Sequence, residues 1–122
     1  MANALNWFEI PASDFARAKK FYNTIFEFEL LTDMDPGEGF EMGMFPAQDG
    51  VGGAVIQGEG YTPSAEGSLV YLNAGEDLSD VLGRVEAAGG QVIMPKTSIG
   101  ENGFVAYFKD SEGNRVGLHS MG

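Results

Sequence analysis

Apolar residues recur along the chain with two periods, one typical of strands and one typical of helices. The apolar and aromatic run at residues 5–10 ends at Pro11 and predicts a short strand. Helical spacing follows and predicts a helix over residues 14–24, with Ser13 as its N-cap and Asp14 in its positive first turn. The residues that carry this spacing are Phe15, Ala18, Tyr22 and Ile25.

After this helix, three apolar runs separated by turn-rich segments predict three strands, at residues 26–32, 40–45 and 53–57. The segment 58–67 is rich in Gly, Ser and Pro and has no periodicity, which indicates a linker.

The same order of patterns then restarts. Residues 68–73 predict a strand, and a helix follows that is capped by Glu76 or Asp77 and stopped by the glycine pair at 89–90. The apolar face of this helix consists of Leu78, Val81, Leu82, Val85 and Ala88. Three further strands are predicted at residues 91–95, 103–110 and 114–120.

The repeated order predicts two β-α-β-β-β modules within a single domain that spans residues 1–122. Module one covers about 3–57, the linker covers 58–67, and module two covers about 68–121. Asp14 and Asp77 occupy equivalent places in the two modules. The fold class predicted from this order is therefore α+β.

Composition narrows the class of protein. The chain has 122 residues, no cysteine and a formal net charge of −11, with no Lys or Arg between Lys20 and Arg84. Nucleic acid and acidic membrane surfaces bind clustered Lys and Arg, so neither is an expected partner. The chain has no apolar run of the roughly eighteen residues that a membrane span needs. Absence of cysteine and of a leader-like N-terminus fits a cytoplasmic protein.

Four segments together resemble the vicinal oxygen chelate superfamily, which includes glyoxalase I, bleomycin resistance proteins and ring-cleaving dioxygenases. They are FEIPASDFARAKKFYNTIFEFEL, GGAVIQ, VLGRVEAAGGQVI and FVAYFKDSEGNRVGL, and the likeness extends over nearly the whole chain. The resemblance implies that the strands of two modules form an incompletely closed barrel, with the helices outside and a ligand cavity on the concave face. It also implies a homodimer.

Strand alternation gives an independent prediction of the two faces, because successive strand residues point to opposite sides. The face beneath the helices is predicted to hold Phe8, Ile10, Ala54, Ile56, Val116 and Leu118. The opposite, ligand-facing side is predicted to hold Trp7, Glu9, Val55, Gln57, Arg115, Gly117 and His119.

The resemblance also implies four strand positions that hold a divalent metal in metal-using relatives. Here they fall on Trp7, Gln57, Ser68 (or Leu69) and Gly117. An indole and a glycine supply no ligand, so the metal site is incomplete and no cofactor is expected. Ni, Zn, Mn or Fe would bind only if the ligands were relocated, for example to Glu9 and His119. We expect the four positions to line one cavity nevertheless.

Three residues keep alternative interpretations. Glu9 is either a pocket carboxylate that binds ligand or acts as a base, or a strand residue paired with a neighbour such as Arg115. His119, the only histidine, either hydrogen-bonds a ligand or is structural. Trp7 either fills the vacant metal position or stacks on a flat ligand.

Three functions remain open. The favoured interpretation is a metal-free domain that binds a small organic molecule, with Trp7, Glu9, Gln57, Ser68, Gly117 and His119 as ligand-binding candidates. The second is a lyase, isomerase or dioxygenase-type enzyme that uses Glu9 and His119, or relocated metal ligands. The third is a regulatory module that uses the fold as a scaffold, since fold alone does not decide function.

Overall fold

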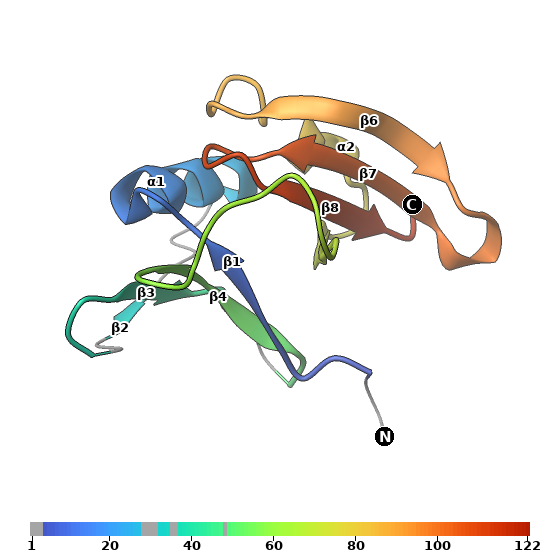
Figure 1. Cartoon of the computed structure of the whole chain (residues 1–122). Helices are drawn as coiled ribbons and strands as arrows, with labels where there is room; N and C mark the ends of the chain where they lie inside the picture. The colour runs from blue at the N-terminus through green and yellow to red at the C-terminus, as the bar shows by residue number, and fades with distance from the viewer. Residues whose placement is uncertain (1–3, 28–31, 35–36, 48) are drawn as a thin grey trace.

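The computed structural model describes residues 4–27, 32–34, 37–47 and 49–122. Over these residues the chain forms an α+β fold whose eight strands lie in two sheets that do not close into a barrel (Figure 1). The predicted fold class is confirmed. No helix within the described ranges is long and apolar enough to cross a membrane.

The first sheet contains the strands of the N-terminal half in the order β1-β4-β3-β2. β1 pairs with β4 in parallel, and β4 pairs with β3 and β3 with β2 in antiparallel fashion. The elements of this half are β1 (Trp7–Pro11), α1 (Phe15–Phe26), β2 (Thr32–Met34), β3 (Glu41–Met44) and β4 (Gly52–Gln57). Residues 28–31, which belong to the predicted strand 26–32, lie outside the described residues.

The second sheet repeats this topology in the order β5-β8-β7-β6. Here β5 pairs with β8 in parallel, as β1 does with β4 in the first sheet. Its elements are β5 (Tyr71–Asn73), α2 (Ser79–Leu82), β6 (Gln91–Ser98), a short 3-10 helix (Gly100–Asn102), β7 (Phe104–Lys109) and β8 (Arg115–Ser120). Both halves therefore have the element order that the sequence predicted, although strand limits shift by a few residues.

The N-cap of helix α1 lies one residue later in the sequence than predicted. Asp14, not Ser13, is the N-cap residue, and its side chain accepts a hydrogen bond of 3.1 Å from the Arg17 amide. The amide of Ser13 is instead bound by the carboxylate of Glu112. The helix ends at Phe26, and its C-cap residue, Glu27, adopts a left-handed conformation with φ of 57°.

The second helix is much shorter than predicted. Only Ser79–Leu82 are α-helical, and the chain continues through turns to Gly89. Val81 and Val85 are nevertheless buried as the apolar spacing predicted. After these turns the backbone at Gly90 passes close to Lys109 and Phe21. Only glycine fits there, because a Cβ at this position would lie 2.7 Å from the Lys109 carbonyl oxygen and 2.8 Å from the Phe21 ring.

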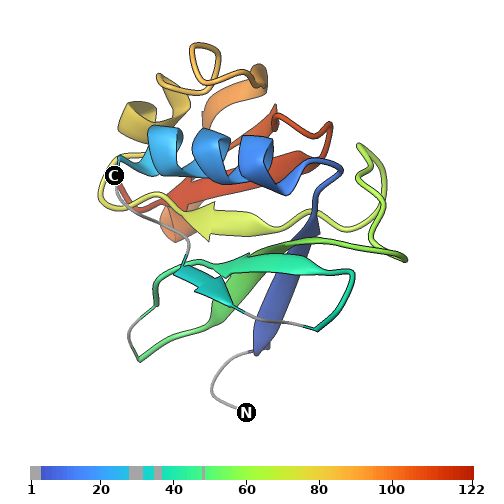
Figure 2. The ribbon, with the colours of Figure 1, turned by 90° about the vertical axis from the view of Figure 1, so that its left-hand side faces the viewer.

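One hydrophobic core joins the two halves. The ring centroids of Phe21 on α1 and Phe108 on β7 are 5.8 Å apart, and Leu72, Val116 and Leu118 belong to the same cluster as Phe21. Figure 2 shows α1 between α2 and the first sheet, in front of the strands of the second. The helices therefore cover one side of each sheet, and we call the other side its open face.

Pairing register corrects the predicted face of β4. Glu9 lies opposite Ala54 and Ile10 lies opposite Val55 in the parallel β1–β4 pair. Directly paired residues share a face, so Ala54 is on the open face and Val55 is in the core. The sequence analysis had placed Ala54 beneath the helices and Val55 on the ligand-facing side. That prediction was wrong because alternation within each strand does not show which residues of β1 and β4 lie opposite one another. The assignments of Val116 and Leu118 to the helix side were correct.

Candidate functional site

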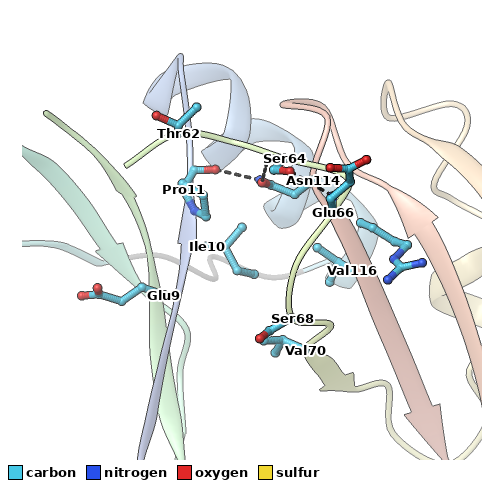
Figure 3. Close-up of a pocket in the computed structure, with 11 residues that line it drawn as sticks. Glu9, Ile10, Pro11, Thr62, Ser64, Glu66, Ser68, Val70, Asn114 and Val116 are labelled. Atoms are coloured by element: carbon cyan, nitrogen blue, oxygen red, sulfur yellow. Dashed lines mark hydrogen bonds between the residues drawn. The ribbon is translucent and has the colours of Figure 1, made fainter. Parts of the chain in front are cut away.

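A pocket lies where the two halves of the chain meet, between the end of β1, the start of β8 and the linker (Figure 3). We call it the seam pocket, and its volume is about 150 Å³. Its apolar floor is Ile10, Val70 and Val116. Its polar rim is contributed by Glu9, Thr62, Ser64, Glu66, Ser68, Asn114 and Arg115, and Pro11 completes the lining.

Asn114 fixes the shape of the seam pocket. Its side-chain amide donates a 2.7 Å hydrogen bond to the Pro11 carbonyl oxygen, and its Oδ1 accepts a 3.0 Å bond from the Ser64 amide. The residue is only 5% exposed. One buried amide thus ties β1 and the linker to the start of β8, as the dashed lines in Figure 3 show.

Asp110 in turn fixes Asn114. Its carboxylate accepts hydrogen bonds from the Asn114 amide at 2.9 Å, the Asn114 side chain at 3.1 Å and the Tyr22 hydroxyl at 2.7 Å. Burial raises the pKa of Asp110, although these hydrogen bonds oppose the rise. Burial, followed by the charge of Asp110, also raises the pKa of Tyr22 well above its usual value.

Asp110, Glu112 and Asn114 belong to the hairpin that joins β7 to β8, and Glu112 holds the N-terminus of α1 against this hairpin. Its carboxylate accepts hydrogen bonds of 2.9 Å from the Ser13 amide and 2.8 Å from the Asp14 amide, and it pairs with Arg17 at 2.6 Å. Burial alone would raise the pKa of Glu112, but the Arg17 and amide hydrogen bonds outweigh it and the pKa is lowered. The hairpin therefore positions Pro11, which comes just before α1.

Glu9 lines the seam pocket but directs its carboxylate away from the other labelled residues in Figure 3. Glu9 Oε2 accepts a 3.4 Å hydrogen bond from the Trp7 indole. A hydrogen bond with Glu9 raises the pKa of Tyr61. The predicted alternative partner, Arg115, stacks instead over the Tyr107 ring, with 5.3 Å between its guanidinium carbon and the ring centroid.

Of the residues predicted to bind a ligand, Glu9 and Ser68 line the seam pocket. Gln57 lies on the opposite face of β4 from Ala54, and its Oε1 accepts a 2.6 Å hydrogen bond from the Phe15 amide at the start of α1. It therefore faces the helix and not the open face. Of Trp7, Gln57, Ser68 and Gly117, which were predicted to line one cavity, only Ser68 lines the seam pocket.

Gly117 and His119 do share the open face of the second sheet, as predicted. Tyr71 pairs with Gly117 and Asn73 pairs with His119. The Tyr71 ring covers Gly117 so closely that a Cβ there would lie 2.3 Å from a ring carbon. Nε2 of His119 lies 2.6 Å from the Asn102 carbonyl oxygen, and because a carbonyl oxygen only accepts, Nε2 is the donor in this contact.

Comparison with known proteins identifies the family. The family model for the glyoxalase/bleomycin resistance protein/dioxygenase superfamily matches residues 4–118. The chain belongs to this superfamily. CFP32, a candidate glyoxylase of Mycobacterium bovis, is 33% identical over 117 residues, which cover 93% of this chain and 44% of CFP32. The CFP32 of Mycobacterium tuberculosis matches equally. The chain spans less than half the length of these curated relatives.

Solved structures of the superfamily have the same fold. A glyoxalase I mutant from Zea mays is 21% identical with a TM-score of 0.67, covering 95% of this chain and 45% of its own. A superfamily domain from Frankia sp. is 12% identical with a TM-score of 0.69 and 98% coverage of both chains. The fosfomycin resistance protein FosX from Listeria monocytogenes is 15% identical with a TM-score of 0.65, covering 98% and 92%.

The metal positions that the superfamily resemblance implies do not fit a metal ion here. Trp7 has no coordinating atom, Gly117 has no side chain, and the Gln57 oxygen already accepts the Phe15 amide from the other face of the sheet. Over the described residues, His, Cys, Asp and Glu form no group of three or more that could hold a metal ion. We therefore derive no chemistry through a metal.

Sequence reasoning missed most of the polar rim of the seam pocket. Thr62, Ser64 and Glu66 were assigned to the linker and not to the site, and the contribution of Asn114 was not foreseen. The available signal was the hydroxyl-rich composition of residues 62–68, TPSAEGS, beside the Asn of the hairpin. Asn and Ser side chains in such segments commonly bind backbone groups, as Asn114 and Ser64 do here.

Proposed function

We propose that this chain is a cytoplasmic, metal-free member of the superfamily that binds a small polar organic molecule in the seam pocket. The observation that supports this is the composition of the pocket, whose lining joins an apolar floor to three hydroxyl groups and to the charged residues Glu66 and Arg115. Ligand sites commonly combine apolar walls with a few such polar groups. The groups come from both halves of the chain and from the linker.

The distribution of titratable residues favours binding over acid–base catalysis. Glu9 lines the seam pocket, whereas His119 lies on the open face of the second sheet with Nε2 bound to the Asn102 carbonyl. Neither pocket described here is lined by both residues. General acid–base catalysis needs both groups within hydrogen-bonding reach of one substrate.

A lyase or dioxygenase-type activity is the second candidate. It is favoured by the 33% identity to CFP32, which is named as a candidate glyoxylase. In that case a second copy would have to bring its own groups to the open face near His119.

We further propose a homodimer, and no nucleic-acid partner. Large apolar side chains remain accessible at Trp7 (43% exposed) on β1 and Tyr71 (44% exposed) on β5. Both belong to strands at the edge of their sheets. Such accessible aromatic side chains are typical of protein–protein interfaces. The net charge of −11 disfavours a polyanionic partner.

The proposal is tested by a fragment screen that uses the backbone amide signals of isotope-labelled protein. We expect small polar fragments to shift the amides of Ser64, Ser68 and Arg115. Ser68→Leu should fill the pocket and weaken binding. Ala65→Leu, in the same exposed linker but outside the pocket lining, is the matched control. Shifts that occur elsewhere and are unaffected by Ser68→Leu would contradict the proposal.

A further inference from the structure

A second, larger pocket lies beside the seam pocket and differs from it in chemistry. Its volume is about 290 Å³, and its walls include Leu5, Phe8, Phe26, Phe45 and Tyr71. The rings of Phe8 and Phe45 are 5.3 Å apart. We call it the aromatic pocket. Gly53 allows this arrangement, because a Cβ there would lie 2.3 Å from the Phe8 ring.

The two pockets share one wall. Val70 lines both of them. On β1, Ile10 lines the seam pocket and Phe8, two residues earlier on the same face, lines the aromatic pocket. On the other side, Ser68 borders the first pocket and Leu72 the second. The pockets thus follow one another along the junction of β1 with residues 68–73, and only the Val70 side chain is common to both.

Size indicates a single occupant for both. Pockets that bind small molecules usually measure about 300–1,000 Å³. The seam pocket, at about 150 Å³, is too small for this range, and the aromatic pocket, at about 290 Å³, lies at its lower limit. Together they fall within it, with a polar and an apolar end.

We propose that the ligand is an amphipathic amine, whose ammonium head lies in the seam pocket and whose aryl or alkyl tail crosses Val70 into the aromatic pocket. This deepens the proposed function and rests on it. The aromatic pocket suits the tail because its walls are rings and aliphatic groups, with Asn73 as a polar group at its edge.

Charge favours a cationic head. Glu66 lines the seam pocket with no ion pair to another described residue. The one cation of the pocket, Arg115, lies over the Tyr107 ring on the open face of the second sheet. The field of the whole chain, with a net charge of −11, also attracts cations.

The test measures dissociation constants by calorimetry for four probes. They are 3-phenylpropylamine, 3-phenylpropan-1-ol, 3-phenylpropanoate and propylamine. We expect 3-phenylpropylamine to bind most tightly with one molecule per chain, and to shift the amides of both Ser68 and Val51. Each buried methylene should tighten binding about fourfold, so propylamine should bind far more weakly than the phenyl compound.

Variants separate the two ends of the site. Glu66→Gln should weaken binding of both amines by about threefold to tenfold, whereas Glu59→Gln, the same change outside the pocket lining, should not. Val51→Trp should fill the aromatic pocket, reducing 3-phenylpropylamine affinity to that of propylamine. Ile93→Trp, on exposed β6, is its control.

The outcomes distinguish the inference from the proposed function. Equal affinity of propylamine and 3-phenylpropylamine for the seam pocket would overturn the inference and leave the proposed function standing. Tighter binding of the alcohol or the carboxylate would also overturn it, by showing that the head is neutral or is selected by Arg115. Binding of 3-phenylpropylamine to the aromatic pocket alone would overturn the inference and argue against the seam pocket as the site.

Discussion

The hydroxyl group of Tyr22 on α1 donates a 2.7 Å hydrogen bond to the carboxylate of Asp110, a residue of the second half of the chain. Tyr22 is fully buried and Asp110 is 4% exposed. Through Asn114, which binds both Asp110 and the Pro11 carbonyl, this contact reaches the rim of the seam pocket. Hydrogen bonds between the helix of one half and the hairpin of the other therefore fix the position of Asn114 at the rim of the pocket.

Tyr22→Phe tests this contact. The ring contacts with Phe21 at 4.9 Å and Phe45 at 5.5 Å are kept, but Asp110 loses a buried hydrogen-bond donor. We expect the free energy of unfolding to fall by about 1–3 kcal/mol in urea denaturation. Tyr61→Phe, which removes a hydroxyl bonded to the exposed Glu9, should change it by less. Equal losses of unfolding free energy in the two variants would show that the Tyr22–Asp110 hydrogen bond stabilises the fold no more than the exposed Tyr61–Glu9 bond does.

The salt bridge between Asp77 and Lys96 gives a pH-dependent contribution to stability. The Ser79 amide, and then Lys96 at 2.9 Å, lower the pKa of Asp77 to about 2. A carboxylate with a lowered pKa stabilises the fold above its ordinary pKa, and this contribution is lost as the pH falls from about 4 to about 2.

We expect the melting temperature of Asp77→Asn to lie below that of the parent at pH 6 and to converge with it at pH 2. The difference should shrink in high salt, because both side chains are partly exposed. Asp80→Asn, which removes the same charge from the start of α2, is the control. A difference that stays constant from pH 6 to pH 2 would exclude this titration as its cause.

Two strand glycines beneath aromatic rings offer a matched pair. A Cβ at position 117 would lie 2.3 Å from the Tyr71 ring, whereas one at position 52 would lie 3.5 Å from the Trp7 ring, which is ordinary contact. Gly117→Ala should therefore displace Tyr71 and lower the melting temperature, with a cost of about 1–3 kcal/mol. Gly52→Ala should be nearly neutral. Similar melting temperatures for both variants would contradict the close packing at Gly117.

Metal addition tests the metal-free proposal. We expect that excess Ni²⁺, Zn²⁺ or Mn²⁺ leaves the melting temperature unchanged, because Trp7 and Gly117 supply no ligand and Gln57 is bound to Phe15. Treatment with EDTA should likewise have no effect. A stoichiometric metal that raises the melting temperature by mass action would overturn the proposal. Loss of that rise in His119→Ala would identify a relocated site.

The sequence predicted the order of elements because apolar spacing and turn residues are local signals. The helical spacing of Ala18, Tyr22 and Ile25 placed α1 correctly, and all three are fully buried. The length of α2 was not predictable in this way, because helical spacing continues to Ala88 while only four residues are α-helical. Whether such a segment forms a helix or successive turns depends on tertiary packing, which spacing does not encode.

The site was predictable only in part. Glu9 and Ser68, two of the ligand-binding candidates, line one pocket, but Gln57 was placed on the wrong face. Alternation gives the relative orientation of residues within one strand, not the phase between two strands, which is set by their pairing. The roles of Asn114 and Ser64 depend on a contact across 50 positions in the sequence, and no local pattern reveals such a contact.

The proposed homodimer is tested through the single tryptophan of the chain. Trp7 is 43% exposed on an edge strand, so association through this face should bury its indole. We expect light scattering to give the dimer mass, and the fluorescence maximum to shift to shorter wavelength as protein concentration rises through the dissociation constant. Trp7→Ser should yield monomers, whereas Ile99→Ser, which removes an equally exposed apolar side chain after β6, should stay dimeric. A monomer mass at all concentrations would contradict the dimer, and a dimer that persists in Trp7→Ser would place its interface elsewhere.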